Sequence, residues 1–427
     1  MDTVTILLVG AGGRCSIYSQ LVKRLGLRAR IVGVAEPRAF FRDRIVHDHD
    51  IRPEHIFADW RDAAAVPRFA DAVIIGTQDR MHVEPAEAFA GLGYHILIEK
   101  PLAPDAAGCR RIVSAAVKSG KMFSVCHVMR YANYTALLQR VLADGAVGKI
   151  VSVQHLEPVG HWRFAHSYVR GNWRKEAESS SFLLAKSIHD VDWISYIIGK
   201  RSRKISSFGE LSFFRRENMP KGATPRCLDC PLACKCAYNA PHFYLERLRE
   251  GKIDSYLESV SGVLTEEAIL DAMRNGPYGR CVFDCDNDVA DHQVTIMEFE
   301  GGVTASFTLV GCSQYGERRT TIFGTEGEVY CDGSRIKIYN YLRNSSREIE
   351  IEPDRGTLET KHGGGDKMCL ESFIEAILNN DPSKILSDAA GSLETHLMVF
   401  AAEASRKQGR TVDMSEPEFS IGDLAGE

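Results

Sequence analysis

The segment Gly91-Leu92-Gly93-Tyr94-His95-Ile96-Leu97-Ile98-Glu99-Lys100-Pro101 carries the most information about the fold. Its apolar run from Tyr94 to Ile98 predicts a buried strand that stops at Glu99. Ligands of open α/β sheets bind at the carboxyl ends of the strands, where a lysine beside a carboxylate can face a substrate hydroxyl. A solvated surface pair of Glu99 and Lys100 is the alternative. The elements that precede the segment favour the ligand site.

A strand, a glycine turn and a helix open the chain. The apolar run 4–9 leads into Gly10-Ala11-Gly12-Gly13-Arg14-Cys15 and then into a helical pattern. This order is what a dinucleotide-binding fingerprint requires, because Gly10 permits the tight turn and Gly12 lets the backbone approach a pyrophosphate. Cys15 stands where the third glycine of the fingerprint would be. We predict that Gly10, Gly12, Gly13 and Arg14 contact the cofactor.

A second predicted strand, 30–35, ends at Glu36, which lies 26 positions after Gly10. A carboxylate at this place can accept both ribose hydroxyls of NAD and would repel a 2'-phosphate. Arg38 could instead hold that phosphate through its guanidinium group. The sequence therefore predicts NAD as the cofactor, with NADP as the alternative.

Strands and helices continue to alternate up to residue 126, which predicts a parallel, doubly wound α/β sheet. Thr77, Gln78 and His82 follow the strand 71–76, at the same edge as Lys100. We predict that they surround the nicotinamide ribose together with Glu99 and Lys100. A histidine that only bonds backbone groups at a helix start is an equal alternative for His82.

The length of 427 residues exceeds what one hydrophobic core usually supports, so two domains are expected, 1–126 and 127–427. The formal net charge of -5 argues against a nucleic-acid or anionic-membrane partner and favours a small-molecule ligand. No signal peptide or long apolar segment is evident, so we expect a soluble, cytoplasmic protein.

The glycine turn, the loop 77–82 and above all Glu99-Lys100-Pro101 resemble the glucose-fructose oxidoreductase / inositol dehydrogenase / rhizopine-catabolism (Gfo/Idh/MocA) family. The resemblance implies an N-terminal Rossmann domain and a C-terminal α+β domain built on a large, mostly antiparallel open sheet. It also implies bound NAD(H) or NADP(H) and a sugar or cyclitol substrate oxidised at a secondary hydroxyl. Lys100 is then the catalytic or substrate-orienting lysine.

The predicted helix that starts near Phe182 carries the second catalytic candidate. The family usually has Asp, Gly and His across this stretch; here His189 matches, while Ala185 and Ser187 replace the other two and Lys186 is added. The imidazole of His189 is suited to taking a hydroxyl proton. Lys186 and Lys100 would place positive charge beside a developing alkoxide. The alternative for His189 is a helix-start histidine held by nearby aspartates.

A dense aromatic and polar stretch, 160–174, follows no regular period. Sugars bind where aromatic faces lie beside hydrogen-bonding groups, so we predict a substrate wall here, with a structured loop as the alternative. Arg130 is predicted as a substrate or phosphate contact, and an interdomain salt bridge explains it equally well. The predicted substrate residues are Arg130, His166, Tyr168, Arg170 and Trp173.

Six of the twelve cysteines lie between Cys227 and Cys285, in a segment 215–286 that we expect to be an insertion acting as a lid or an oligomer contact. A Cys-x2-Cys pair followed by distant cysteines is typical of a structural Zn²⁺ site. An iron-sulfur cluster and a group of unmetallated buried thiols are the alternatives. The preferred ligands are Cys227, Cys230, Cys236 and Cys281.

Alternating strands from 294 onward predict an antiparallel sheet, part of which the helices 366–378 and 388–407 could cover. We expect a homodimer or homotetramer packed through this sheet. Three functions remain open: a dehydrogenase of sugar-like substrates, a redox-neutral hydrolase or lyase that oxidises its sugar transiently, and a cofactor-binding regulator without catalysis.

Overall fold

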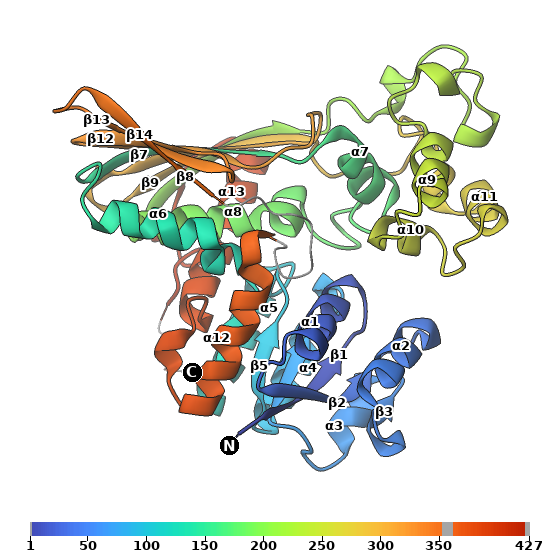
Figure 1. Cartoon of the computed structure of the whole chain (residues 1–427). Coiled ribbons are helices and arrows are strands. Elements are labelled where there is room, and N and C mark those ends of the chain that lie inside the picture. Colours follow the sequence, from blue (N-terminus) through green and yellow to red (C-terminus); the bar gives the residue numbers. More distant parts are fainter. Residues whose placement is uncertain (1, 352–361, 423–427) are drawn as a thin grey trace.

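The computed structural model describes residues 2–351 and 362–422, and it contains two sheets (Figure 1). The N-terminal sheet has the order β3-β2-β1-β4-β5-β6, and all of its strands run parallel. These strands are β1 (Val4–Val9), β2 (Ala29–Ala35), β3 (Ile56–Phe57), β4 (Ala72–Ile75), β5 (His95–Ile98) and β6 (Phe123–Val125). The doubly wound Rossmann sheet is therefore confirmed.

Helices lie on both faces of this sheet, which is why its strands are continuous apolar runs rather than alternating patterns. They are α1 (Gly13–Arg24), α2 (Ala39–His49), α3 (Trp60–Ala65), α4 (Val83–Gly91) and α5 (Ala106–Ser119). All four residues of β4 are buried. The side chain of Asp105 caps α5 by accepting from Gly108 N, and Gly120 ends this helix in the left-handed conformation.

The second sheet has nine strands in the order β14-β13-β12-β11-β7-β10-β9-β8-β15. Only β7 and β10 pair in parallel among these strands, so the predicted mostly antiparallel sheet is confirmed. The strands are β7 (Ile150–Pro158), β8 (Ser202–Glu210), β9 (His292–Phe299), β10 (Thr304–Val310), β11 (Arg319–Gly324), β12 (Gly327–Cys331), β13 (Arg335–Asn340), β14 (Ser345–Glu350) and β15 (Val412–Asp413).

Three helices lie along one face of this sheet: α6 (Asn133–Ala143), α8 (Phe182–Ile198) and α13 (Ala389–Gln408) (Figure 1). The sheet alternates between buried and exposed side chains, and Val151, Phe208 and Ile296 are exposed apolar residues on three of its strands. An exposed apolar face is a common oligomer contact. The homo-oligomer stays a prediction.

The C-terminal helices divide their packing between the two sheets. α13 packs against β8 and α8, as expected, and its Leu393 and Leu397 also enter the core of the Rossmann domain. α12 (Gly365–Asn379) was expected to cover the antiparallel sheet, but it packs on the Rossmann domain, where Leu370 and Phe373 are fully buried. The apolar stripe of α12 fits the side of the parallel sheet that α1 leaves open.

A small helical insertion lies between β8 and β9, beyond the end of the antiparallel sheet (Figure 1). It contains α9 (Ala240–Arg249), α10 (Ser255–Val260) and α11 (Glu266–Asn275), which share a core of their own around Tyr244 and Ile269. Glu258 of α10 pairs with Arg44 of α2 at 3.1 Å. The insertion therefore contacts the Rossmann domain.

Within the part of the chain that the structure describes, no helix is both long enough and apolar enough to span a bilayer.

Candidate active site

Four predicted site segments meet at the carboxyl edge of the parallel sheet. Gly10 follows β1, Glu36 follows β2, Thr77 follows β4 by two residues, and Glu99 with Lys100 follows β5. Parallel strands end at the same edge, so a doubly wound sheet brings these loops together. α8 lies against this edge, because Lys100 Nζ donates a hydrogen bond to Ala185 O at 2.7 Å.

The glycine turn fits a dinucleotide. Gly10 has a φ of +91°, and a Cβ on it would lie 2.7 Å from Gly76 O, so no other residue fits there. Cys15 takes the place of the third glycine by packing its Sγ against Gly76. α1 has no side-chain cap at Gly12 and no acidic residue in its first turn, so its first N–H groups can receive a pyrophosphate.

Glu36 is buried and already has donors. Its carboxylate accepts hydrogen bonds from Ala11 N at 2.8 Å and from the Arg38 side chain at 2.7 and 3.0 Å. Burial opposes the charge, but the bonds from Arg38 and Ala11 keep the pKa of Glu36 below its ordinary value. The residue predicted to accept the ribose hydroxyls is therefore anionic and covered by Arg38.

Arg14 and Glu99, both predicted to contact the cofactor, also contact each other. Arg14 Nε donates to Glu99 Oε1 at 2.8 Å, and the same carboxylate oxygen accepts from Tyr18 OH at 2.7 Å. Asp366 of α12 takes a second bond from Arg14. This network connects α1 and α12 to the end of β5, next to Lys100. Glu99 therefore holds the loop that carries Lys100 in place.

The loop after β4 is held by His82. Its Nδ1 lies 2.8 Å from Pro101 O and its Nε2 lies 3.2 Å from Thr77 O, and the ring is buried. The structure thus places His82 in the backbone-bonding role. It joins the 77–82 loop to the Lys100 loop, whereas the side chain of Gln78 is exposed and Thr77 Oγ1 donates to Met81 O.

His189 lies beside Lys100 in a group of histidines. The ring centroids of His189 and His127 are 6.0 Å apart, and those of His189 and His362 are 6.4 Å apart. Burial, and then the charge of Lys100, holds the pKa of His189 well below its ordinary value. Its Nδ1 has no hydrogen-bond partner within residues 2–351 and 362–422. His189 is therefore a neutral imidazole at physiological pH, as a proton acceptor requires.

Lys186 belongs to a buried network that the sequence did not reveal. Its ammonium pairs with Glu157, and Arg318 Nε lies 3.1 Å from the other oxygen of that carboxylate. Arg318 also pairs with Asp190, which lies 3.0 Å from His155 Nε2. The register of β7 against β11 pairs Leu156 with Arg319 and so brings Glu157 and Arg318 together. Only this register, which spans two distant segments, could have indicated the pair.

The charge of Lys186 depends on pH near neutrality. Burial, together with Arg318 and Arg163, lowers the pKa of Lys186 to about 8, against the attraction of Glu157. The ammonium is present below this pH and is lost as the pH rises through it. We expect kcat/KM for substrate oxidation to carry a falling limb near pH 8, and Lys186→Arg to remove that limb because a guanidinium stays charged. A wild-type profile with no change near this pH would contradict the assignment.

Three predicted substrate residues have other partners. Arg130 donates to both oxygens of Asp192 at 2.7 Å, and this ion pair lies within the second domain. His166 lies 2.7 Å from Tyr244 OH and stacks on Tyr278, both in the insertion. Arg170 donates to two backbone carbonyls, Arg280 O and Tyr238 O, each at 2.8 Å. Arg130 is thus held within the second domain, and His166 and Arg170 contact the insertion, so their role as substrate contacts stays a prediction.

The positions of Tyr168 and Trp173 are more compatible with the predicted contact to the substrate. The ring of Tyr168 is buried against Phe164 and Phe182, and Trp173 is 38% exposed with its ring 6.3 Å from that of Tyr168. Burial raises the pKa of Tyr168, and the charges of Asp79 and Glu157 act in the same direction. Tyr168 therefore lies toward the charged network around Lys186.

The structure does not show the predicted zinc site among the described residues. The cysteines proposed as ligands, Cys227, Cys230, Cys236 and Cys281, line one cavity of about 340 Å³, and all are free thiols. In the described ranges, however, no three His, Cys, Asp or Glu side chains are arranged to hold a metal ion. The guanidinium of Arg170 lies 3.4 Å from Cys227 Sγ, where a cation would have to approach.

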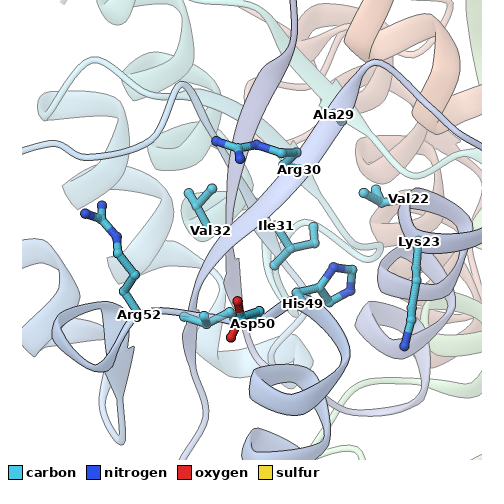
Figure 2. A pocket seen from close by; sticks show the side chains of 10 residues that line it. Val22, Lys23, Ala29, Arg30, Ile31, Val32, His49, Asp50 and Arg52 are labelled. Carbon is cyan, nitrogen blue, oxygen red and sulfur yellow. The ribbon is translucent and has the colours of Figure 1, made fainter.

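A larger cavity, of about 590 Å³, lies away from this chemistry (Figure 2). Its walls include Arg30, Ile31 and Val32 from the start of β2, together with His49 and Arg52 (Figure 2). The start of β2 is at the opposite edge of the parallel sheet from Glu36. This cavity is not the nucleotide site.

Comparisons with known proteins agree with the geometry. The model "Oxidoreductase family, NAD-binding Rossmann fold" matches residues 4–127, and "Oxidoreductase family, C-terminal alpha/beta domain" matches residues 139–414. The chain is 24% identical over 338 residues to YteT of Bacillus subtilis (strain 168), a protein provisionally named an oxidoreductase, and the match covers 75% of each chain.

Two further comparisons show which kinds of enzyme the chain is similar to. The 2,7-anhydro-N-acetylneuraminate hydratase of Escherichia coli (strain K12) is 28% identical over 148 residues, which is 35% of this chain and 39% of the hydratase. The structure of levoglucosan dehydrogenase in complex with NADH and levoglucosan has a TM-score of 0.69 at 17% identity, over 97% of this chain and 100% of that one, and so shares its fold. Since the two family models together match most of the sequence, the chain belongs to the Gfo/Idh/MocA oxidoreductase family.

Proposed function

We propose that this protein is an NAD-dependent dehydrogenase that oxidises a secondary hydroxyl of a sugar-like or cyclitol-like substrate. The observation that carries the proposal is the position of Lys100 and His189 beside each other, at the sheet edge where the glycine turn can receive a dinucleotide. When bound, the nicotinamide supplies the hydride acceptor.

The residues around this edge have complementary tasks. His189 is neutral and accepts the proton of the substrate hydroxyl as the C–H hydride leaves. Lys100, whose ammonium is held by Ala185 O, places positive charge where the alkoxide develops. Lys186 adds a second charge and is itself fixed by Glu157.

NAD is proposed over NADP because Glu36 remains anionic beside the expected ribose position. The guanidinium of Arg38 already bonds to Glu36, so a 2'-phosphate would have to compete with that carboxylate. We expect NADH to form from NAD⁺ on a panel of sugars and cyclitols, with a lower kcat/KM for NADP⁺. The reduced-nicotinamide absorbance band measures both rates. Failure of the whole panel with both cofactors would overturn the dehydrogenase proposal.

A redox-neutral reaction is the second candidate, and the match to a 2,7-anhydro-N-acetylneuraminate hydratase supports it. Ala185 and Lys186 stand in the catalytic stretch where the family usually has a different pattern, which also favours altered chemistry. The same panel separates the two functions. A redox-neutral enzyme converts its substrate with bound NAD but without net NADH, as mass spectrometry of the product would show.

A further inference from the structure

We propose that Arg163 binds a carboxylate of the substrate, so that the sugar processed by this protein is an acidic sugar. The inference deepens the proposed function and rests on it. It comes from the position of Arg163 near Lys100 and Lys186 and from the absence of a counter-ion for it among the described residues.

The backbone places Arg163 beside the catalytic network. Glu157 lies near the end of β7, and Gly160, with a φ of +90°, turns the chain into the short helix α7 (His161–Phe164) that carries Arg163. Ser313 holds this turn in place through two hydrogen bonds. Its Oγ accepts a hydrogen bond from Gly160 N at 3.0 Å, and its carbonyl oxygen accepts one from His161 N at 2.8 Å. The backbone of Arg163 therefore lies at the same end of the sheet as Glu157.

The surroundings of Arg163 are largely aromatic, with Glu157 as the nearby carboxylate and Lys100 and Lys186 as nearby cations. Tyr168, Tyr256 and Tyr315 lie around its guanidinium. The neighbouring ring of Trp162 packs against Tyr256 at 5.3 Å and against Tyr315 at 5.6 Å, which closes this side toward the insertion. Burial raises the pKa of Tyr168 and of Tyr256, so these phenols stay neutral and cannot balance a positive charge.

Arg163 has no hydrogen bond or ion pair with any residue in the described ranges 2–351 and 362–422, although it is more than half buried. Glu157 cannot serve it fully, since Lys186 and Arg318 already bind that carboxylate. Other arginines near the site have partners: Arg14 has Glu99, Arg130 has Asp192, and Arg318 has Asp190. Arg163 is thus a permanent cation without a counter-ion in the part of the chain that the structure describes.

Most charges around the site are paired with one another. Glu157 pairs with Lys186 and Arg318, Asp190 pairs with Arg318, and Arg14 pairs with Glu99 and Asp366. Among the described residues, Arg163 belongs to none of these pairs. A half-buried charge without a partner is costly, and a guanidinium cannot lose its proton to avoid that cost.

A carboxylate on the substrate supplies what is missing. It carries a negative charge, and its two oxygens match the fork of a guanidinium. Acting at a distance from the reacting carbon, Arg163 contributes mainly to binding, so its loss should raise KM more than it lowers kcat.

The test compares matched acidic and neutral sugars. D-glucuronate, D-galacturonate and N-acetylneuraminate are set against D-glucose, D-galactose and a hexose phosphate, by calorimetric binding to the NADH-bound protein and by turnover with NAD⁺. We expect at least one acid to bind about 10- to 100-fold more tightly than its neutral counterpart, as a charged hydrogen-bond pair provides. Arg163→Gln should abolish this preference, Arg163→Lys should retain part of it, and Arg203→Gln, at an exposed arginine of the same domain, should leave it unchanged.

Thermal unfolding separates binding from a structural role. Because Arg163 has no described partner, Arg163→Gln should keep or raise Tm, whereas loss of a structural arginine would lower it. The inference is overturned if no acid binds, if the neutral sugar or the hexose phosphate binds as tightly, or if Arg163→Gln keeps the preference. If an acid binds in a way that depends on Arg163 but no NADH forms, the dehydrogenase proposal is overturned and the proposal of an acidic sugar stands. If NADH forms from neutral sugars alone, the dehydrogenase proposal stands and the proposal of an acidic sugar is overturned.

Discussion

Replacing Lys100 with methionine should lower kcat by roughly 10²- to 10³-fold, the usual loss when one group that stabilises a developing oxyanion is removed. Methionine keeps the length and apolar stem of lysine, so Lys100→Met removes the charge and the hydrogen bond to Ala185 O with little change in packing. Steady-state kinetics on the preferred substrate of the sugar panel measure the effect.

Binding of NADH provides the control for this variant. The glycine turn and Glu36 do not depend on the Lys100 ammonium, so the Kd for NADH should stay within a few fold of the wild-type value. Lys118→Met, at the exposed C-terminal turn of α5, should leave kcat unchanged. If Lys100→Met kept full activity, the ammonium would have no part in the reaction.

Replacing His189 with glutamine should lower kcat by roughly 10²- to 10⁴-fold, which is the range for loss of a positioned general base. Glutamine can form hydrogen bonds but cannot take up a proton, and it is large enough to limit the cavity left by a buried imidazole. Because the pKa of His189 lies well below its ordinary value, activity attributed to it should persist at mildly acidic pH. The pH profile of kcat, measured in wild type and variant, tests both statements.

His47→Gln serves as the matched control, since His47 is an exposed histidine of α2 far from this edge. A lower Tm together with lost activity in His189→Gln would indicate a packing defect, so Tm is measured alongside. A variant that retains kcat and folds normally would remove His189 from the mechanism and leave Lys186 as the alternative proton carrier.

Most of the N-terminal fold follows from local patterns. The apolar runs of β1, β4 and β5 and the glycine turn are each contained within a few residues, so their structure could be predicted one element at a time. β3 contains only Ile56 and Phe57, which is too short to show a period. The packing of α12 on the Rossmann domain was also missed, because an apolar stripe shows which face of a helix is buried but not against what.

Site residues that follow directly after a strand could be predicted from the sequence. Site residues whose partners lie far away in the sequence could not. Lys100 and His189 could be selected as candidates because each stands in a recognisable local context. Arg318 and Glu157 are joined only by the register of β11 against β7. The imidazole of His166 and the guanidinium of Arg170 stand in a stretch typical of a sugar site, yet the insertion satisfies them, and composition alone cannot reveal such partners.

The placement of α12 has a consequence for synthesis of the protein. Leu370 and Phe373 complete the apolar core around β1, and Asp366 completes the ion pairs of Arg14. The nucleotide-binding half leaves the ribosome long before these residues are translated, and until then it exposes the side chains that α12 later covers. The nascent nucleotide-binding domain therefore lacks α12 until translation is nearly finished. During that interval its uncovered apolar surface is a defined target for chaperones.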